Sequence, residues 1–300
     1  MSAARLKRIT SVMGALVLCS SGVALGDDDT KVVDCSRGDS IQRAIDKKNP
    51  DRPLTLVIRG ICSEEVTVQR DDVTLEGDAG AIAGPVTING GRRVVVASLT
   101  ITNPTGDGVT VANGGSATIR DNHIDDNAGY GVFLRNAAFA SVNNNTMLRN
   151  GVVNATNPDA SGIGVSMGST VRALGNEIRE NANTGIEVFD NSTYRSEGDT
   201  IAMRASAPGR SAVDTFRAGY VDLRGATVNG QVFVNQQSQL QVRNVADLTS
   251  TITGNISVSV LSFLRLRAGV VRAASTLSCG IAGFSVCQCD GLPSCPVIQP

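Results

Sequence analysis

Three side chains in the middle of the chain could exchange a proton near neutral pH. His123 is the only histidine, and Glu177 and Glu187 follow it in segments of similar sequence. Imidazole and carboxyl groups act as general acids and bases, for example on a glycan. We therefore take His123, Glu177 and Glu187 as candidate catalytic residues. The alternative interpretation is that they are ordinary solvent-facing residues, or part of a surface that binds calcium or another protein.

Basic and aromatic residues near these positions could bind a sugar. The candidate binding residues are Arg135, Arg179, Phe133 and Phe189. The chain has no tryptophan and three tyrosines, so aromatic stacking alone is a weak basis for sugar binding. Arginine side chains can hold the carboxylates of a polyuronate instead. A second set of arginines, suited to that role, consists of Arg120, Arg172 and Arg195.

An internal repeat must position these residues. Segments with an apolar–x–apolar start carry a further apolar residue fifteen positions later, and they begin at Val86, Val109, Val132, Ile163 and Ile186. Three of these segments are 23 residues long. Short alternating runs predict strands with one buried side. A repeat of this length without a helix predicts one coil of a solenoid, whose strands stack about 4.8 Å apart. We therefore predict an all-β, single-domain parallel β-helix.

Polar residues recur two positions before the later apolar residue of each coil. They are Asn122, Asn145, Asn176 and Asp199. In a stacked solenoid such residues would form a ladder in which each amide bonds the next. The alternative is a row of exposed loop residues.

The second and fifteenth residues of each coil should point outward on either side of one corner. His123 and Glu177 would then lie about 10 Å apart, two coils from each other. The same corner carries the extra residues 151–161 and 204–210. Because loops beside an exposed sheet face can form a groove, we predict that a glycan would bind at this corner.

Both ends of the mature chain have features of a cap. Ser40–Asp46 is predicted to form an amphipathic helix, ahead of a first strand at Leu54–Ile58. The expected organisation is a signal peptide at 1–26, a cap with this helix at 27–65, a β-helix at 66–276 and a cysteine-rich tail at 277–300. A solenoid needs such covers on its first and last coils.

The N-terminal segment predicts export. Arg5, Lys7 and Arg8 precede a short apolar stretch that ends before Ala24 and Gly26, as in a cleaved signal peptide rather than a membrane anchor. Removing these three residues from 27 basic residues leaves 24, against 28 acidic residues, which does not favour nucleic acid or an anionic membrane as partner. We expect a secreted or periplasmic monomer.

Removal of the signal peptide would leave six cysteines, an even number, which predicts three disulfides in an oxidising compartment. They are Cys35, Cys62, Cys279, Cys287, Cys289 and Cys295. A metal site at the four C-terminal cysteines is the rival, but their spacing fits zinc motifs poorly.

The run CSRGDSIQRAI from Cys35 to Ile45, followed by the coils, resembles the N-terminal cap of secreted bacterial β-helix-repeat proteins. Over about residues 35–275 the chain resembles the pectin-lyase-like superfamily, which implies a right-handed parallel β-helix. The superfamily contains lyases, hydrolases, epimerases, esterases, adhesins and proteins without known activity. The resemblance therefore implies the fold and leaves the activity open.

The catalytic motifs of these relatives are largely missing. Asp125 and Asp126 resemble the aspartate pair of polygalacturonase-like hydrolases, but the companion Asn-Thr-Asp and His-Gly elements are absent. One histidine excludes sites that need two, and the acidic residues form no evident calcium cage. We predict no metal and no cofactor; calcium is the alternative, although no motif points to it.

Our first functional hypothesis is a secreted β-helix protein that binds an extracellular partner such as a polysaccharide. The second is a polysaccharide lyase or epimerase acting on an acidic glycan, and the third is a structural envelope protein. Arginines clustered with a glutamate or aspartate in one groove would favour the second hypothesis. An evenly polar surface would favour the third.

Overall fold

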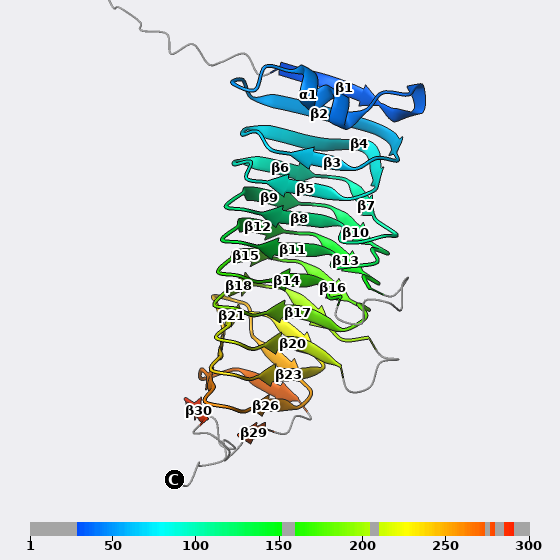
Figure 1. Ribbon diagram of the computed structural model, residues 1–300. Helices are drawn as coiled ribbons and strands as arrows, with labels where there is room; N and C mark the ends of the chain where they lie inside the picture. Colours follow the sequence, from blue (N-terminus) through cyan, green and yellow to red (C-terminus); the bar gives the residue numbers. More distant parts are fainter. Residues whose placement is uncertain (1–28, 152–159, 205–209, 274–276, 280–284, 291–300) are drawn as a thin grey trace, which may run out of the picture.

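The computed structural model describes residues 29–151, 160–204, 210–273, 277–279 and 285–290. They form a column of stacked coils, in which each regular coil contributes three short parallel strands (Figure 1). The column therefore has three faces, which we call first, second and third in the order in which the chain meets them. The predicted all-β parallel solenoid is confirmed.

The first face lies at the front of Figure 1. Its ten strands are β3 (Val66–Val68), β5 (Val86–Asn89), β8 (Val109–Ala112), β11 (Val132–Arg135), β14 (Ile163–Val165), β17 (Thr184–Val188), β20 (Ser211–Thr215), β23 (Gln231–Val234), β26 (Ile256–Val258) and β29 (Leu277–Cys279). The second face consists of β6 (Val94–Ala97), β9 (Ser116–Arg120), β12 (Phe139–Asn143), β15 (Thr170–Leu174), β18 (Thr193–Glu197), β21 (Tyr220–Arg224), β24 (Gln239–Arg243), β27 (Phe263–Leu266) and β30 (Val286–Cys289).

The third face consists of β7 (Thr100–Thr102), β10 (His123–Asp125), β13 (Thr146–Leu148), β16 (Glu177–Arg179), β19 (Thr200–Ala202), β22 (Thr227–Asn229), β25 (Thr251–Thr253) and β28 (Val271–Ala273). At the N-terminal end, β1 (Asp29–Asp34), β2 (Leu54–Cys62) and β4 (Val73–Ala83) are longer. The 11 residues of β4 pair with both β6 and β7, so this strand spans two faces.

Alternation along each strand builds the core. In β11, Val132 and Leu134 are fully buried while Phe133 and Arg135 point outward. The register places Val132 between Val109 and Ile163, so the aliphatic side chains of successive coils stack inside the column. Each buried aliphatic contributes on the order of 1.5–3 kcal/mol to folding.

The corner between the second and third faces contains the predicted polar ladder. The Nδ2 group of Asn122 donates to Oδ1 of Asn145, and Nδ2 of Asn145 donates to Oδ1 of Asn176, at 2.9 and 3.1 Å. Asn176 donates in turn to Oδ1 of Asp199 at 3.0 Å. All four side chains are buried. A second ladder, at the corner after the third face, joins Asn127, Asn150 and Asn181.

Asp199 ends the first ladder. Its Oδ1 accepts from Asn176, and its Oδ2 accepts from the Tyr194 hydroxyl at 2.6 Å inside the core. The next coil has Ala226 at this position and offers no side-chain acceptor. A carboxylate needs no acceptor in the next coil, because it has no hydrogen-bond donor. An asparagine would add two N–H donors that need one. Burial raises the pKa of the Asp199 carboxyl.

The N-terminal cap is built around helix α1 (Ile41–Lys47), which lies over the first coils (Figure 1). Ser40 caps it by accepting from the Arg43 amide, and Ile41, Ala44 and Ile45 are buried, as the sequence predicts. A disulfide joins Cys35 to Cys62, as predicted for the cysteines of an exported chain. Strand β1, which pairs with β2, is absent from the sequence-based expectation.

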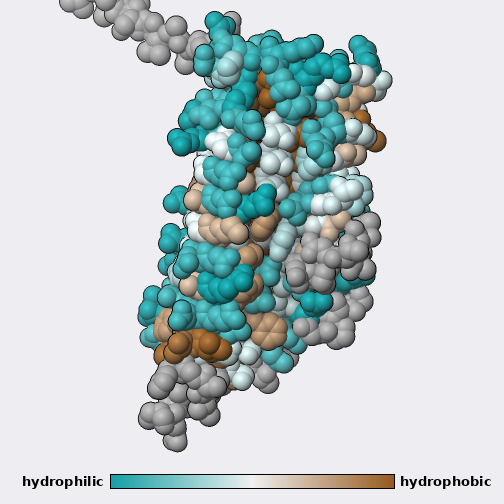
Figure 2. All heavy atoms as spheres, viewed as in Figure 1, coloured by the Kyte–Doolittle hydropathy of each residue, from teal (hydrophilic) through white to brown (hydrophobic). Residues whose placement is uncertain are grey.

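A second disulfide joins Cys279 to Cys287 near the C-terminal end. Cys289 is also disulfide-bonded, whereas Cys295, the predicted signal peptide and most of the two corner insertions lie outside the described residues. None of the described helices is long and apolar enough to cross a membrane. The surface in view is mostly hydrophilic or neutral, and its broadest strongly hydrophobic patch lies near the C-terminal end (Figure 2).

Candidate functional site

The predicted site residues fall on two faces that meet at one corner. His123 on β10 and Glu177 on β16 lie in one outward row of the third face, because each is in register with Thr146. Strand spacing puts their backbones about 10 Å apart. Both side chains are exposed, and Glu177 forms an ion pair with Arg179 on its own strand.

Glu187 and Phe133 lie on the first face instead. Their outward row runs from Phe133 through Gly164 and Glu187 to Asp214. The corner turns this row away from His123 and Glu177, so the described structure does not bring the three candidate catalytic residues onto one face. Residues 152–159 and 205–209, which make up most of the predicted groove walls, lie outside the described residues.

Glu187 is not the solvent-facing acid that its outward position predicts, because it is only 7% exposed. The Tyr130 hydroxyl donates to its Oε2 at 2.7 Å across three coils. Gly164 makes this possible, since a Cβ there would lie 2.6 Å from the Tyr130 ring. Phe133 stacks on Tyr130 with ring centroids 4.6 Å apart. Neighbouring aromatic rings therefore shield this carboxylate.

Two acidic residues that the sequence reasoning missed lie on or beside the same face. Burial raises the pKa of the Asp214 carboxyl to about 6, and it also raises the pKa of Asp107. Asp107 accepts from the Tyr130 amide and the Thr110 hydroxyl, so it orders the turn before β11. Arg135 is exposed, and its charge favours the ionised form of Asp107.

Phe189 is half-buried on the first face. Its ring stacks on Phe216, with centroids 5.1 Å apart, and the Arg217 guanidinium lies over both rings. Asp190 forms an ion pair with Arg217 at 2.8 Å. The Arg217 guanidinium and one side of the Phe189 ring therefore already have partners within the protein.

The second face carries the arginines of the second set. Arg172 on β15 and Arg195 on β18 are direct register partners, and both are exposed. The guanidinium of Arg172 lies 5.8 Å from the centroid of the Phe139 ring, and that of Arg195 lies 5.9 Å from the Tyr220 centroid. Each arginine is thus held against an aromatic ring from a neighbouring strand.

Arg172 and Arg195 differ from the other arginines on the strands of this face. Arg120 pairs with Glu76 and Asp121, and Arg265 pairs with Asp290. Arg224 and Arg243 both pair with Asp222, which is 2% exposed, at 2.9 Å each. Among the described residues, Arg172 and Arg195 form no ion pair. Like charges directly opposite on neighbouring strands are destabilising, so this pair costs stability.

The two arginines line a pocket of about 330 Å³. Arg224 and Glu197 also contribute to its walls. Glu197 forms no ion pair with the described residues. An open pocket with two unpaired guanidinium groups can bind anionic groups, and its one unpaired carboxylate could accept a proton.

The sequence flagged Arg172 and Arg195, and the structure shows why they differ from Arg120. Sequence analysis did not identify Phe139, Tyr220 or Glu197 as candidate site residues. The strand register could have identified the two aromatic residues. Phe139 lies one coil from Arg172 and Tyr220 lies one coil from Arg195, both in the adjacent outward row.

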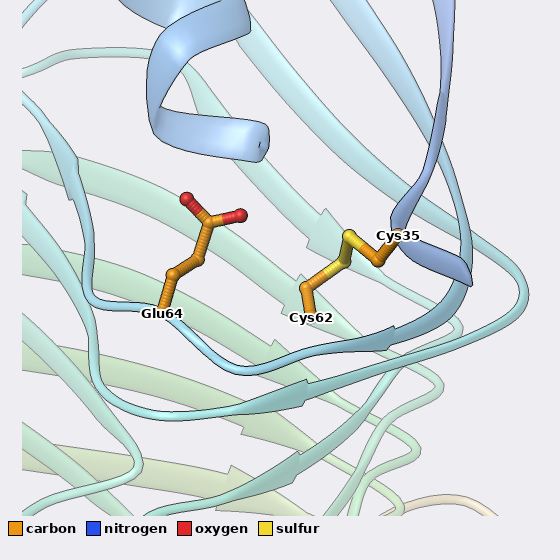
Figure 3. A group of neighbouring side chains, drawn as sticks. All are labelled: Cys35, Cys62 and Glu64. Carbon is orange, nitrogen blue, oxygen red and sulfur yellow. A yellow bond between two sulfur atoms is a disulfide. The ribbon is translucent and has the colours of Figure 1, made fainter. Parts of the chain in front are cut away.

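Within the described part of the chain, one group of side chains has ligand atoms close enough for a metal: Cys35, Cys62 and Glu64. The cysteines are joined in a disulfide, so their sulfur atoms are not thiolates (Figure 3). The Glu64 carboxylate points towards the start of α1 and accepts from the Ser40 hydroxyl and the amides of Ile41 and Gln42. These contacts explain the group as a covalent and electrostatic support for the cap.

Comparison with known proteins identifies the family. Residues 80–244 match the family described as right handed beta helix region, which is more than half of the chain. The chain belongs to this family, and the predicted right-handed parallel β-helix is thereby confirmed. A search of curated proteins finds no match.

Two solved structures are similar in fold. Pectate lyase Pel9A has a TM-score of 0.55 at 12% identity, covering 90% of this chain and 82% of the lyase chain. An alginate lyase from Paenibacillus sp. str. FPU-7 has a TM-score of 0.53 at 12% identity, covering 86% and 99% respectively. Identities this low support a common fold and carry no assignment of activity.

Proposed function

We propose that this protein is an exported β-helix protein that binds an acidic polysaccharide on its second face. The observation that carries the proposal is the adjacent pair Arg172 and Arg195, which lacks carboxylate partners within the described structure. Other arginines of the face are neutralised internally. A ligand carboxylate would remove the repulsion between the two guanidinium groups.

The surroundings of the pair suit a saccharide. Phe139 and Tyr220 hold the guanidinium groups without neutralising them, which lowers the cost of ordering two long side chains on binding. The pocket of about 330 Å³ is open to the surface beside them. Pectate and alginate, named in the two similar structures, are the first polymers to test.

The disulfides support export. Cys35–Cys62 and Cys279–Cys287 are bonded, and such bonds persist in oxidising compartments. The segment at 1–26 has the composition of a signal peptide. We place the protein outside the cytoplasm, where acidic polysaccharides occur.

The test is a binding titration of the purified mature protein with polygalacturonate, alginate and a neutral glucan in calcium-free buffer. We expect binding to an acidic polymer, weakening as salt rises, and none to the neutral one. Changing both Arg172 and Arg195 to Gln should reduce affinity by about tenfold or more. Arg92→Gln removes an exposed arginine elsewhere and should change nothing. Equal affinity of the double variant and the parent would refute the proposal.

Glu197 favours a second candidate function, a lyase or epimerase. A lyase or epimerase must remove the proton beside a uronate carboxylate while cations stabilise the resulting enolate. Glu197 lines the same pocket as Arg172 and Arg195, so a base and two cations lie together. Conversion would be followed by ultraviolet absorbance of unsaturated ends and by proton exchange with deuterated water. If Glu197→Gln abolishes conversion while binding persists, the protein is an enzyme; binding without any conversion leaves it a binding protein.

A further inference from the structure

We propose that the pocket on the second face recognises two contiguous acidic groups of one glycan chain, aligned along the axis of the solenoid. The inference rests on the proposed function and adds the specificity of the site. Its ligand class is a polymer in which neighbouring sugar residues both carry a free carboxylate.

The number of groups follows from the number of available cations. Arg172 and Arg195 occupy successive positions in one outward row, separated by a single strand spacing of about 4.8 Å. Each guanidinium can form a bidentate contact with one carboxylate. Arg224, the third arginine of the pocket, is held by Asp222.

The outward row carries no basic residue directly before Arg172 or directly after Arg195. Ser141 precedes Arg172 in register, and Asp222 follows Arg195. A third carboxylate placed before Arg172 would meet a neutral hydroxyl. One placed after Arg195 would meet Asp222, whose charge is already balanced by Arg224 and Arg243. The row therefore offers two anion positions.

The direction of the ligand follows from the strand stacking. Arg172 and Arg195 are displaced from each other along the column, across the strands. A chain whose successive carboxylates contact both must run along that axis. Glu197 stands two residues from Arg195 on the same strand and lines the pocket, so its charge disfavours a carboxylate displaced sideways. The aromatic rings of Phe139 and Tyr220 lie on the opposite side of the row.

The experiment compares two partly methyl-esterified polygalacturonates of equal length and equal total charge. In one the free acids occur in blocks, and in the other they are randomly distributed. Titrations in calcium-free buffer should show about tenfold tighter binding of the block polymer, the effect of one additional charge-assisted contact. Arg172→Gln and Arg195→Gln should each remove this preference while retaining weak binding to both polymers. Arg92→Gln, which alters an exposed arginine away from the pocket, should retain the full preference.

Equal affinity for the block and random polymers would overturn the inference and leave acidic-polysaccharide binding intact. A preference that survives either single substitution would also overturn it, because the paired arginines would not be its cause. If no acidic polymer binds, both the proposed function and this inference fail. Thermal unfolding of each variant at or above the parent's temperature shows that lost binding reflects the arginine and not a loss of the fold, as expected for exposed side chains.

Discussion

Asn145→Ala tests the corner ladder that holds neighbouring coils in register. The Asn145 side chain takes part in five hydrogen bonds: its Oδ1 accepts from the backbone amide and Nδ2 of Asn122, and its Nδ2 donates to Asn176 Oδ1 and to the carbonyl oxygens of Ile119 and Asn143. The residue is 1% exposed, so water does not replace these partners.

The magnitude follows from what the substitution leaves behind. Nδ2 of Asn122 retains the Val96 carbonyl as an acceptor, but the Asn122 amide loses the acceptor Oδ1 of Asn145. An unsatisfied buried group costs about 1–3 kcal/mol, and the other lost bonds add to it. We expect the free energy of unfolding to fall by about 3 kcal/mol.

The assay is equilibrium unfolding in urea, followed by circular dichroism. Asn143→Ala is the matched control, because Asn143 lies on the same coil and is half-buried on the outer surface. Among the described residues, its side chain bonds only to Ser141. Its cost should be below about 0.5 kcal/mol. Equal unfolding midpoints for the two variants would refute the reasoning that the ladder stabilises the fold.

Two further predictions concern the cap and the first face. Replacing both Cys35 and Cys62 by Ser should lower stability by about 3–4 kcal/mol, because the bond constrains a long loop in the unfolded chain. Free thiol at either position in the native protein, found by mass spectrometry under non-reducing conditions, would contradict this. Burial raises the pKa of Asp214 to about 6 in the folded protein. Its contribution to stability is therefore fully present below about pH 4 and is lost between about pH 4 and 6. The free energy of unfolding should fall by up to about 3 kcal/mol over this range. Asp214→Asn should flatten that part of the pH profile of unfolding free energy. A variant profile that runs parallel to the parent's would show that Asp214 is not responsible for the pH dependence.

The repeating elements could be predicted because their causes are local. Alternation in segments such as Val132–Arg135 requires only that one side of a strand is buried, and stacking identical coils then sets the neighbours of Asn145. The capping helix follows from a Ser40 cap and three apolar residues on one side. Strand β1 was missed because its burial pattern depends on pairing with β2, 25 residues further along the chain.

Exposure and charge pairing of the outward residues were not predictable in the same way. Glu187 occupies an outward position, yet Tyr130, 57 residues earlier, reaches it over Gly164 and helps to bury it. The distance in sequence between these residues depends on a coil that is longer than the others. No local pattern in the chain encodes that contact.

The sequence by itself determined the solenoid and the corner ladder from Asn122 to Asp199, since both depend on side chains that repeat with the coil. It also determined the capping helix, which depends on residues close together in the chain. Only the tertiary structure decided which arginines of the second face remain available. Arg224 and Arg243 share Asp222, whereas Arg172 and Arg195 stand beside aromatic rings. That difference depends on rotamers and on register partners one and two coils away, and residue type alone does not specify it.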